Sequence, residues 1–128
     1  MINRLHHVAI IGCDKASSLR FYRDLLGLRV VAEHYQENRN SWKIDLALES
    51  GMQIELFIFH DAPCRLSYPE ARGLRHIAFC VDDLDKMLVT LAEEGVQAEP
   101  VRTDPYTQAK FTFVQDPDGL PVELYQSV

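Results

Sequence analysis

Leu5-His6-His7-Val8-Ala9-Ile10 is the stretch that decides the fold, because it returns as Leu74-Arg75-His76-Ile77-Ala78-Phe79, 69 residues later. A second stretch, Gly51-Met52-Gln53-Ile54-Glu55-Leu56-Phe57, returns 68 residues later as Gly119-Leu120-Pro121-Val122-Glu123-Leu124-Tyr125. Self-similarity at a nearly constant offset indicates an internal repeat. We therefore predict one domain over residues 1–128 with two similar modules, at about 1–60 and about 73–128. Prolines and a glycine mark the linker between them, at about 61–72.

Each module is predicted to contain a strand, a helix and three further strands. The opening strands are rich in branched and apolar residues. A helix should run from Asp14 to Leu26 and another from Asp82 or Asp83 to Gly95, since an aspartate caps each start and a glycine follows each end. This order indicates an α+β fold of two βαβββ modules. The expected strands are 5–11, 28–36, 43–49 and 52–59, then 74–81, 96–103, 109–115 and 120–126.

Composition narrows the function classes. The chain has 128 residues, of which 47% are hydrophobic and 25% charged, and a net charge of −6. Dispersed negative charge without a Lys/Arg cluster argues against nucleic acid and against an anionic membrane surface as partners. No apolar run approaches the roughly 18 residues of a membrane span. The start has no signal-peptide core, and three cysteines without a CxxC spacing disfavour disulfides, so we expect a cytoplasmic protein. These cysteines are Cys13, Cys64 and Cys80.

Two histidines and two glutamates are predicted to share one type of sheet face. Side chains alternate between the two faces along a strand, so residues with branched aliphatic side chains should pack on the helices. The opposite faces then carry His7 and Glu55 in module one, and His76 and Glu123 in module two. His7 and Glu55 are 48 residues apart, and His76 and Glu123 are 47 apart.

The repetition of this pair favours a shared metal site. Taken singly, each of these residues is more often structural or solvated. A carboxylate among apolar neighbours costs several kcal/mol unless it is paired or bound to a metal. One divalent cation would neutralise both glutamates, and the mixed imidazole and carboxylate donors suit Zn, Ni, Co, Mn or Fe(II). Residue types alone leave the choice among these metals open.

At these residues the sequence resembles the vicinal oxygen chelate superfamily, which includes glyoxalase I. The resemblance implies two βαβββ modules whose curled mixed sheets enclose a metal cleft. It also implies that the metal ligands are His7, Glu55, His76 and Glu123. The matching stretches are 5–10, Ser18-Leu19-Arg20-Phe21-Tyr22, Leu26-Gly27-Leu28, 53–57, 73–79, Asp116-Pro117-Asp118-Gly119 and Glu123-Leu124-Tyr125.

The resemblance implies proton abstraction next to a carbonyl. Glyoxalase I isomerises the hemithioacetal of methylglyoxal and glutathione, and its divalent metal stabilises the enediolate that forms when a proton leaves carbon. A glutamate that leaves the metal acts as the base and returns the proton to the neighbouring carbon. We expect Glu123 to be this base, with Glu55 as the second choice.

One departure from the family pattern concerns glutathione. Glyoxalase I enzymes usually carry an arginine four residues after the first ligand histidine, where it helps to hold glutathione. Here that position is Ile11, which puts glutathione as co-substrate in doubt. Other side chains that are candidates for holding an anionic substrate are Arg39, Lys43, Arg102 and Lys110.

Three alternative functions share the fold. An epimerase of the methylmalonyl-CoA type tends to have Gln at the position of Glu55. A non-haem Fe(II) dioxygenase would use two histidines and one carboxylate, so a fourth ligand counts against it. A metal-free binding module would be expected to lose the ligand set. The resemblance also implies a small-molecule substrate and a homodimer, and the sequence leaves open whether the four ligands meet within one chain or across two chains.

Overall fold

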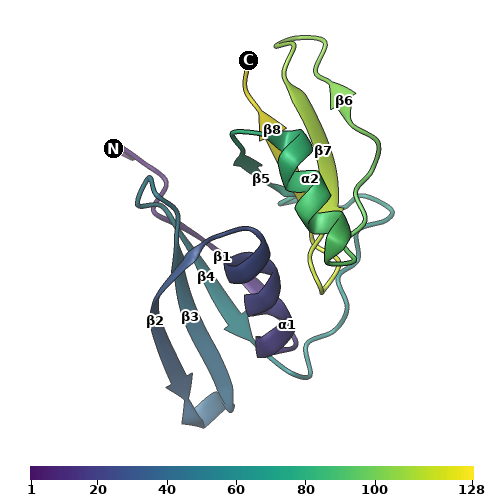
Figure 1. Ribbon diagram of the computed structural model, residues 1–128. Helices are drawn as coiled ribbons and strands as arrows, with labels where there is room; N and C mark the ends of the chain where they lie inside the picture. The colour runs from purple at the N-terminus through teal and green to yellow at the C-terminus, as the bar shows by residue number, and fades with distance from the viewer. The chain divides into compact units, whose positions relative to one another are not determined.

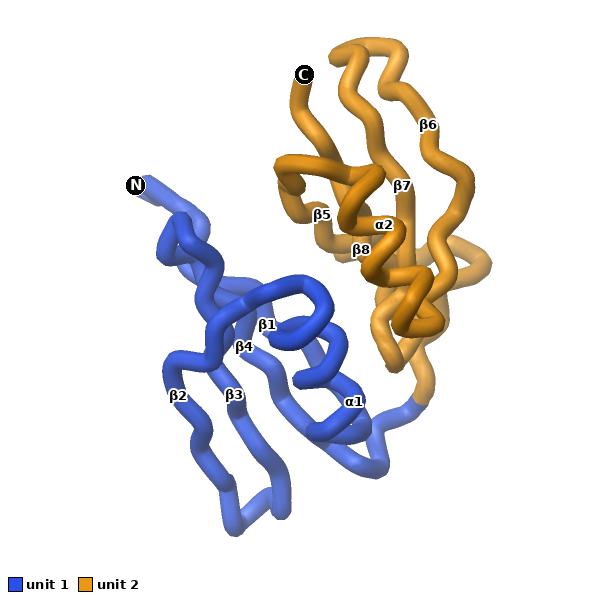
Figure 2. Tube along the Cα trace, viewed as in Figure 1, with its two compact units in different colours: residues 1–63 blue, residues 64–128 orange.

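The computed structural model describes residues 1–128, which form two compact units, Met1–Pro63 and Cys64–Val128 (Figure 2). Each unit contains one four-stranded sheet and a helical segment that follows its first strand. Figure 1 shows the helix of each unit beside its own sheet. The elements of the first unit are β1 (His7–Gly12), α1 (Lys15–Leu19), β2 (Arg29–Gln36), β3 (Ser41–Ala47) and β4 (Gln53–Ile58). Those of the second are β5 (Ile77–Cys80), α2 (Leu84–Glu93), β6 (Arg102–Thr103), β7 (Lys110–Gln115) and β8 (Pro121–Gln126).

The two sheets have the same topology. Their strand orders are β1-β4-β3-β2 and β5-β8-β7-β6. In each, the first strand lies parallel to the last strand of the unit, and the remaining pairs are antiparallel. The predicted α+β fold of repeated βαβββ modules is therefore confirmed.

One face of each sheet forms the core of its unit, as the alternation of side chains predicts. Ile54, Leu56 and Ile58 of β4 are fully buried, and so are Val122 and Leu124 of β8. The residues between them on the same strands are partly exposed. In the second unit α2 packs against β8 and buries Leu84 and Leu91. The ionisable residues between the core positions are thus left on the opposite face of each sheet.

Aspartate caps begin both helices at the predicted places. The Asp14 carboxylate accepts a hydrogen bond from the Ser17 N–H, and the Asp83 carboxylate accepts one from the Lys86 N–H. Gly27 and Gly95 follow the helical segments with φ of 83° and 81°, a left-handed conformation that favours glycine and ends a helix.

The first helical segment differs from the continuous α-helix expected up to Leu26. After α1, residues Arg20–Leu25 form a π-helix, in which the N–H of Leu26 donates to the carbonyl of Phe21. The wider turn contains two adjacent aromatic residues, Phe21 and Tyr22, which are both buried and meet edge to face. Sequence periodicity does not distinguish a single wide turn of this kind from an α-helix.

The strand expected over 96–103 is also shorter in the structure, where only Arg102–Thr103 pairs as β6. Pro100 interrupts the segment because proline has no N–H to donate to a neighbouring strand. The chain before it is still attached to β7, since the Glu99 N–H donates to the Phe113 carbonyl and the Thr112 hydroxyl donates to the Glu99 carbonyl. The segment therefore follows the sheet edge without forming a full ladder.

Replacing Leu56 by alanine is expected to lower the free energy of unfolding by about 2–5 kcal/mol, because it leaves a cavity beneath the first sheet. Urea unfolding followed by circular dichroism measures the change. The matched control is Val31→Ala on β2, where the side chain is exposed and the expected change is about 0.5 kcal/mol or less. Equal losses in both variants would contradict the assignment of this face as the core.

No helix of the structure is both long enough and apolar enough to cross a membrane.

Candidate metal centre

The first half of the candidate site is formed by two residues of the first sheet. His7 opens β1 and Glu55 lies on the neighbouring parallel strand β4. The Nε2 atom of His7 is 3.3 Å from Oε2 of Glu55. The Glu55 side chain keeps only 15% of its exposure, whereas His7 keeps 40%. A carboxylate this far removed from water needs a partner, and His7 provides one.

The second half repeats this arrangement in the second unit. His76 immediately precedes β5 and Glu123 lies on β8. Their Nε2 and Oε2 atoms are 3.1 Å apart, and the glutamate is again the more buried partner. The edge of the His76 ring meets the ring of Phe113, with the ring centroids 5.0 Å apart, which restricts the orientation of the imidazole.

Strand register explains why both pairs form. Glu55 is in register with Ala9, and Glu123 is in register with Ala78. In each unit the histidine precedes that alanine by two residues, which puts it on the same face as the glutamate. The parallel pairing of first and last strands therefore brings together residues that lie far apart in sequence.

The donor atoms in each pair have a separation that suits a common cation. Two ligands at about 2.1 Å from one metal lie about 3.0 Å apart at right angles and about 3.4 Å apart at the tetrahedral angle. The observed separations of 3.3 and 3.1 Å lie within this range. Imidazole nitrogen and carboxylate oxygen are also the donors that divalent transition metals accept. The residues present thus fit a divalent metal ion.

The structure brings His7 to Glu55 and His76 to Glu123, and each pair belongs to a different unit. No group of three or more His, Cys, Asp or Glu side chains is arranged to hold a metal ion. Each pair by itself provides two donors. The sharing of one cation by all four residues stays a prediction.

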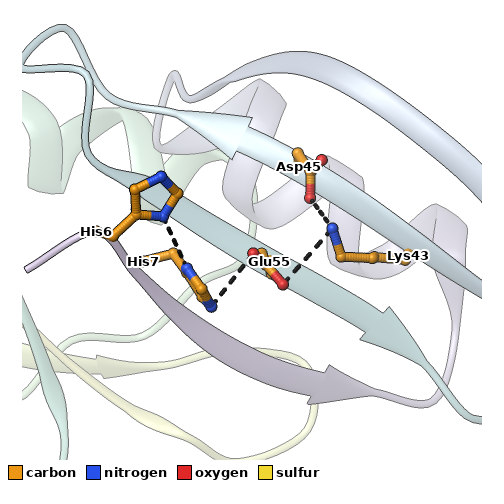
Figure 3. A network of polar contacts seen from close by, with 5 residues as sticks. All are labelled: His6, His7, Lys43, Asp45 and Glu55. Carbon is orange, nitrogen blue, oxygen red and sulfur yellow. Dashed lines mark hydrogen bonds and ion pairs between the residues drawn. The ribbon is translucent and has the colours of Figure 1, made fainter.

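Two further charged residues extend the first pair into the network drawn in Figure 3. The Nζ atom of Lys43 is 3.0 Å from Oδ1 of Asp45 and 3.6 Å from Oε1 of Glu55. Its hydrogen bond to the Asp45 carboxylate raises the pKa of Lys43 above its ordinary value, although burial acts in the opposite direction. Lys43 therefore keeps its positive charge at neutral pH beside the two carboxylates.

From the sequence, Lys43 was predicted only as a candidate for holding an anionic substrate, and Asp45 was not singled out. The register across the hairpin contained the missing signal, because Ala47 pairs with Gln53 and Asp45 therefore stands directly opposite Glu55. Two like charges at directly opposed positions are destabilising unless a cation lies between them. Lys43, two residues earlier on the same face, is that cation.

His6 was also not assigned a role from sequence. Its Nδ1 atom is 2.9 Å from Nδ1 of His7, so one of the two imidazoles donates a hydrogen bond to the other. If His7 offers its Nε2 lone pair to a cation, its Nδ1 must carry the proton and donate to His6. Hydrogen bonds of this kind orient metal-binding histidines in proteins.

The other side chains that sequence analysis considered for substrate binding have different surroundings. Ile11 is exposed on the same face of β1 as His7 and offers no charge. The guanidinium of Arg39 lies over Phe59, and that of Arg102 lies over Phe111 and Phe113. Lys110 pairs with Asp85 of α2 on the helix side of its sheet. The three cysteines form no disulfide and are exposed.

Comparison with known proteins agrees with this fold. Residues 4–124 match the model of the Glyoxalase/Bleomycin resistance protein/Dioxygenase superfamily, and the chain belongs to that superfamily. The predicted family resemblance is thereby confirmed. The chain is 53% identical over 125 residues to the uncharacterized protein YaeR of Escherichia coli (strain K12), an alignment that covers 98% of this chain and 97% of YaeR.

Solved structures give the same result. A glyoxalase family protein from Enterococcus faecalis is 43% identical and superposes with a TM-score of 0.87, covering 95% of this chain and 96% of that chain. The trypanothione-dependent glyoxalase I of Leishmania major is 25% identical with a TM-score of 0.75, covering 98% and 87% of the two chains. The superfamily and the fold are therefore established, and the reaction is a matter for proposal.

Proposed function

We propose that the protein is a divalent-metal-dependent lyase or isomerase of the glyoxalase I type, acting on a small molecule with two adjacent oxygens. The observation that carries the proposal is the repeated His–Glu pair. Both units place an imidazole nitrogen and a carboxylate oxygen of neighbouring parallel strands within 3.3 Å of each other, on the face away from the core. A metal site built from two repeats requires the same pair at the same register in each, and both repeats have it.

The proposed metal ligands are His7, Glu55, His76 and Glu123. A divalent cation held by them would supply the positive charge that stabilises negative charge developing on two neighbouring substrate oxygens. The two histidines hold their position through ring contacts, with His6 against His7 and Phe113 against His76.

Glu123 is the proposed base, which takes the proton from the substrate carbon and returns it to the neighbouring carbon. The surroundings of the two glutamates support this division. Glu55 stands opposite Asp45 and beside Lys43, whereas Glu123 stands opposite Phe113. An ammonium group at 3.6 Å restrains Glu55, while the aromatic neighbour of Glu123 offers no comparable charge.

The exposed Ile11 indicates which class of substrate the site would accept. It lies on the face of His7, at the position where glyoxalase I enzymes usually carry an arginine, and an uncharged aliphatic side chain cannot pair with a carboxylate of a thiol peptide. We therefore propose an oxygen-chelating substrate that does not depend on glutathione. A homodimer and a cytoplasmic location remain proposals, which rest on the family resemblance and on cysteines that form no disulfide.

One experiment separates this enzyme from a binding module of the same fold. The purified protein is stripped with a chelator, reloaded separately with Zn, Ni, Co, Mn and Fe(II), and its metal content is measured by elemental analysis. Each form is then incubated with methylglyoxal, with and without glutathione, and thioester and lactate are quantified. Turnover is expected to vanish on stripping and to return on reloading.

Two results would contradict the proposal. Less than about a tenth of an equivalent of every metal after reloading would leave only the binding module, since a structured site of this donor type holds its metal through gel filtration. Turnover that survives complete stripping would show that the chemistry needs no cation. Turnover only with glutathione would keep the enzyme class and correct the proposed substrate.

A further inference from the structure

The two halves of the candidate site differ in what stands beside the glutamate. In the first unit the neighbouring strand β3 places Asp45 opposite Glu55 and Lys43 opposite Phe57. In the second unit the corresponding positions of β7 are Phe113, opposite Glu123, and Phe111, opposite Tyr125. A charged pair in one repeat thus replaces an aromatic pair in the other.

The two carboxylate oxygens of Glu55 face different partners. Oε1 faces the Lys43 ammonium at 3.6 Å, and Oε2 faces Nε2 of His7 at 3.3 Å (Figure 3). Asp45 holds Lys43 more closely, at 3.0 Å. Because the two oxygens of a carboxylate are equivalent, a half-turn that exchanges them restores the same arrangement, but a rotation that turns both oxygens toward His7 separates the carboxylate from Lys43.

From this division we infer that Lys43, braced by Asp45, is a positioning residue that holds Glu55 with a single oxygen, Oε2, directed to the metal. The inference rests on the proposed metal site and assigns to it two residues that are not ligands. Lys43 keeps Oε1 out of the coordination sphere. Its pairing with Asp45 also keeps the second carboxylate of this face from competing for the cation.

The direction of the change in metal affinity on removing Lys43 distinguishes a positioning role from a purely electrostatic one. A positive side chain near a cation repels it, so removing Lys43 by charge alone would strengthen metal binding. Losing a group that orients a ligand has the opposite effect and typically weakens metal affinity about 10- to 100-fold. We expect weaker binding, because the loss of the fixed orientation of Glu55 outweighs the electrostatic attraction that the uncovered Asp45 carboxylate adds.

The test measures Co²⁺ affinity and the visible absorption spectrum of the Co²⁺-loaded protein, without reference to activity. Wild type, Lys43→Met and Lys43→Arg are compared by competition with a chromophoric chelator. Lys43→Met is expected to bind Co²⁺ about 10-fold or more weakly and to shift the ligand-field bands. Lys43→Arg keeps a cation that can contact both carboxylates, so it is expected to restore most of the affinity and the wild-type spectrum.

Lys110→Met is the matched control, because it removes the same charge from a strand lysine that pairs with Asp85 instead of a proposed ligand. Thermal unfolding of each metal-free variant verifies that the fold is kept. Unchanged or tighter Co²⁺ binding in Lys43→Met would overturn the inference alone, as would a Lys43→Arg variant that behaves like Lys43→Met. Absence of Co²⁺ binding by wild type would overturn the metal site and this inference together.

Discussion

Glu123→Gln is expected to lower kcat about 10²- to 10⁴-fold, the usual contribution of a positioned general base. The amide has the shape of the carboxylate but cannot take a proton from carbon. The side chain lies on the face of β8 away from the buried Val122 and Leu124, so the fold is expected to survive. Steady-state kinetics with methylglyoxal, with and without glutathione, measure kcat, and elemental analysis reports the metal content of the same preparation.

The companion variant Glu55→Gln is expected to lose less of kcat and more of the metal, since Lys43 restrains Glu55 as a ligand. Glu93→Gln serves as the matched control, because Glu93 is exposed at the end of α2. Full activity in Glu123→Gln with its metal in place would end the assignment of the base. A larger loss of kcat in Glu55→Gln would transfer that role to Glu55.

His7→Ala and His76→Ala are each expected to lose the same single metal ion, although they lie in different units. If four residues share one cation, removing either imidazole takes away one of its two nitrogen donors, and metal content should fall from about one equivalent to below about a tenth. Elemental analysis after reloading and gel filtration gives the stoichiometry. The double variant should be no worse than either single one.

The number of metal equivalents lost in each variant distinguishes one shared site from two separate sites. Two independent sites would give two equivalents in the wild type and leave one in each single variant, which would refute the sharing. His60→Ala is the control, because the His60 ring is hydrogen-bonded to the Cys13 carbonyl instead of to a carboxylate. Loss of metal in this control would indicate damage to the fold.

Most of the fold could be predicted because the gene repeat supplied a second copy of each signal. Strict alternation along one strand predicts which residues lie on its buried face, here Ile54, Leu56 and Ile58. Asp14 was identifiable as a cap from its position before apolar periodicity, and Asp83 was one of two candidates with Asp82. Where a helical segment differs only in its hydrogen-bonding pattern, as in the π-helix over Arg20–Leu25, periodicity alone was insufficient.

The His–Glu pairs of the candidate site could be predicted from the sequence, whereas the residues that contact Glu55 from β3 could not. Parity and repetition were enough to put His7 with Glu55, because both properties are visible in a linear sequence. The roles of Lys43 and Asp45 depend on which residue of β3 stands opposite Glu55, and that depends on the register of the hairpin at Gly51. A shift of one residue there would have moved both side chains to the buried face.

The replacement of the Lys43–Asp45 pair by Phe111 and Phe113 in the other repeat makes the two half-sites unequal toward dissolved salt. Ions in solution screen a partly exposed ion pair and leave contacts with aromatic rings almost unchanged. Raising the ionic strength should therefore loosen the contact between Lys43 and Glu55, whereas Glu123, whose strand neighbour is Phe113, has no such contact to lose.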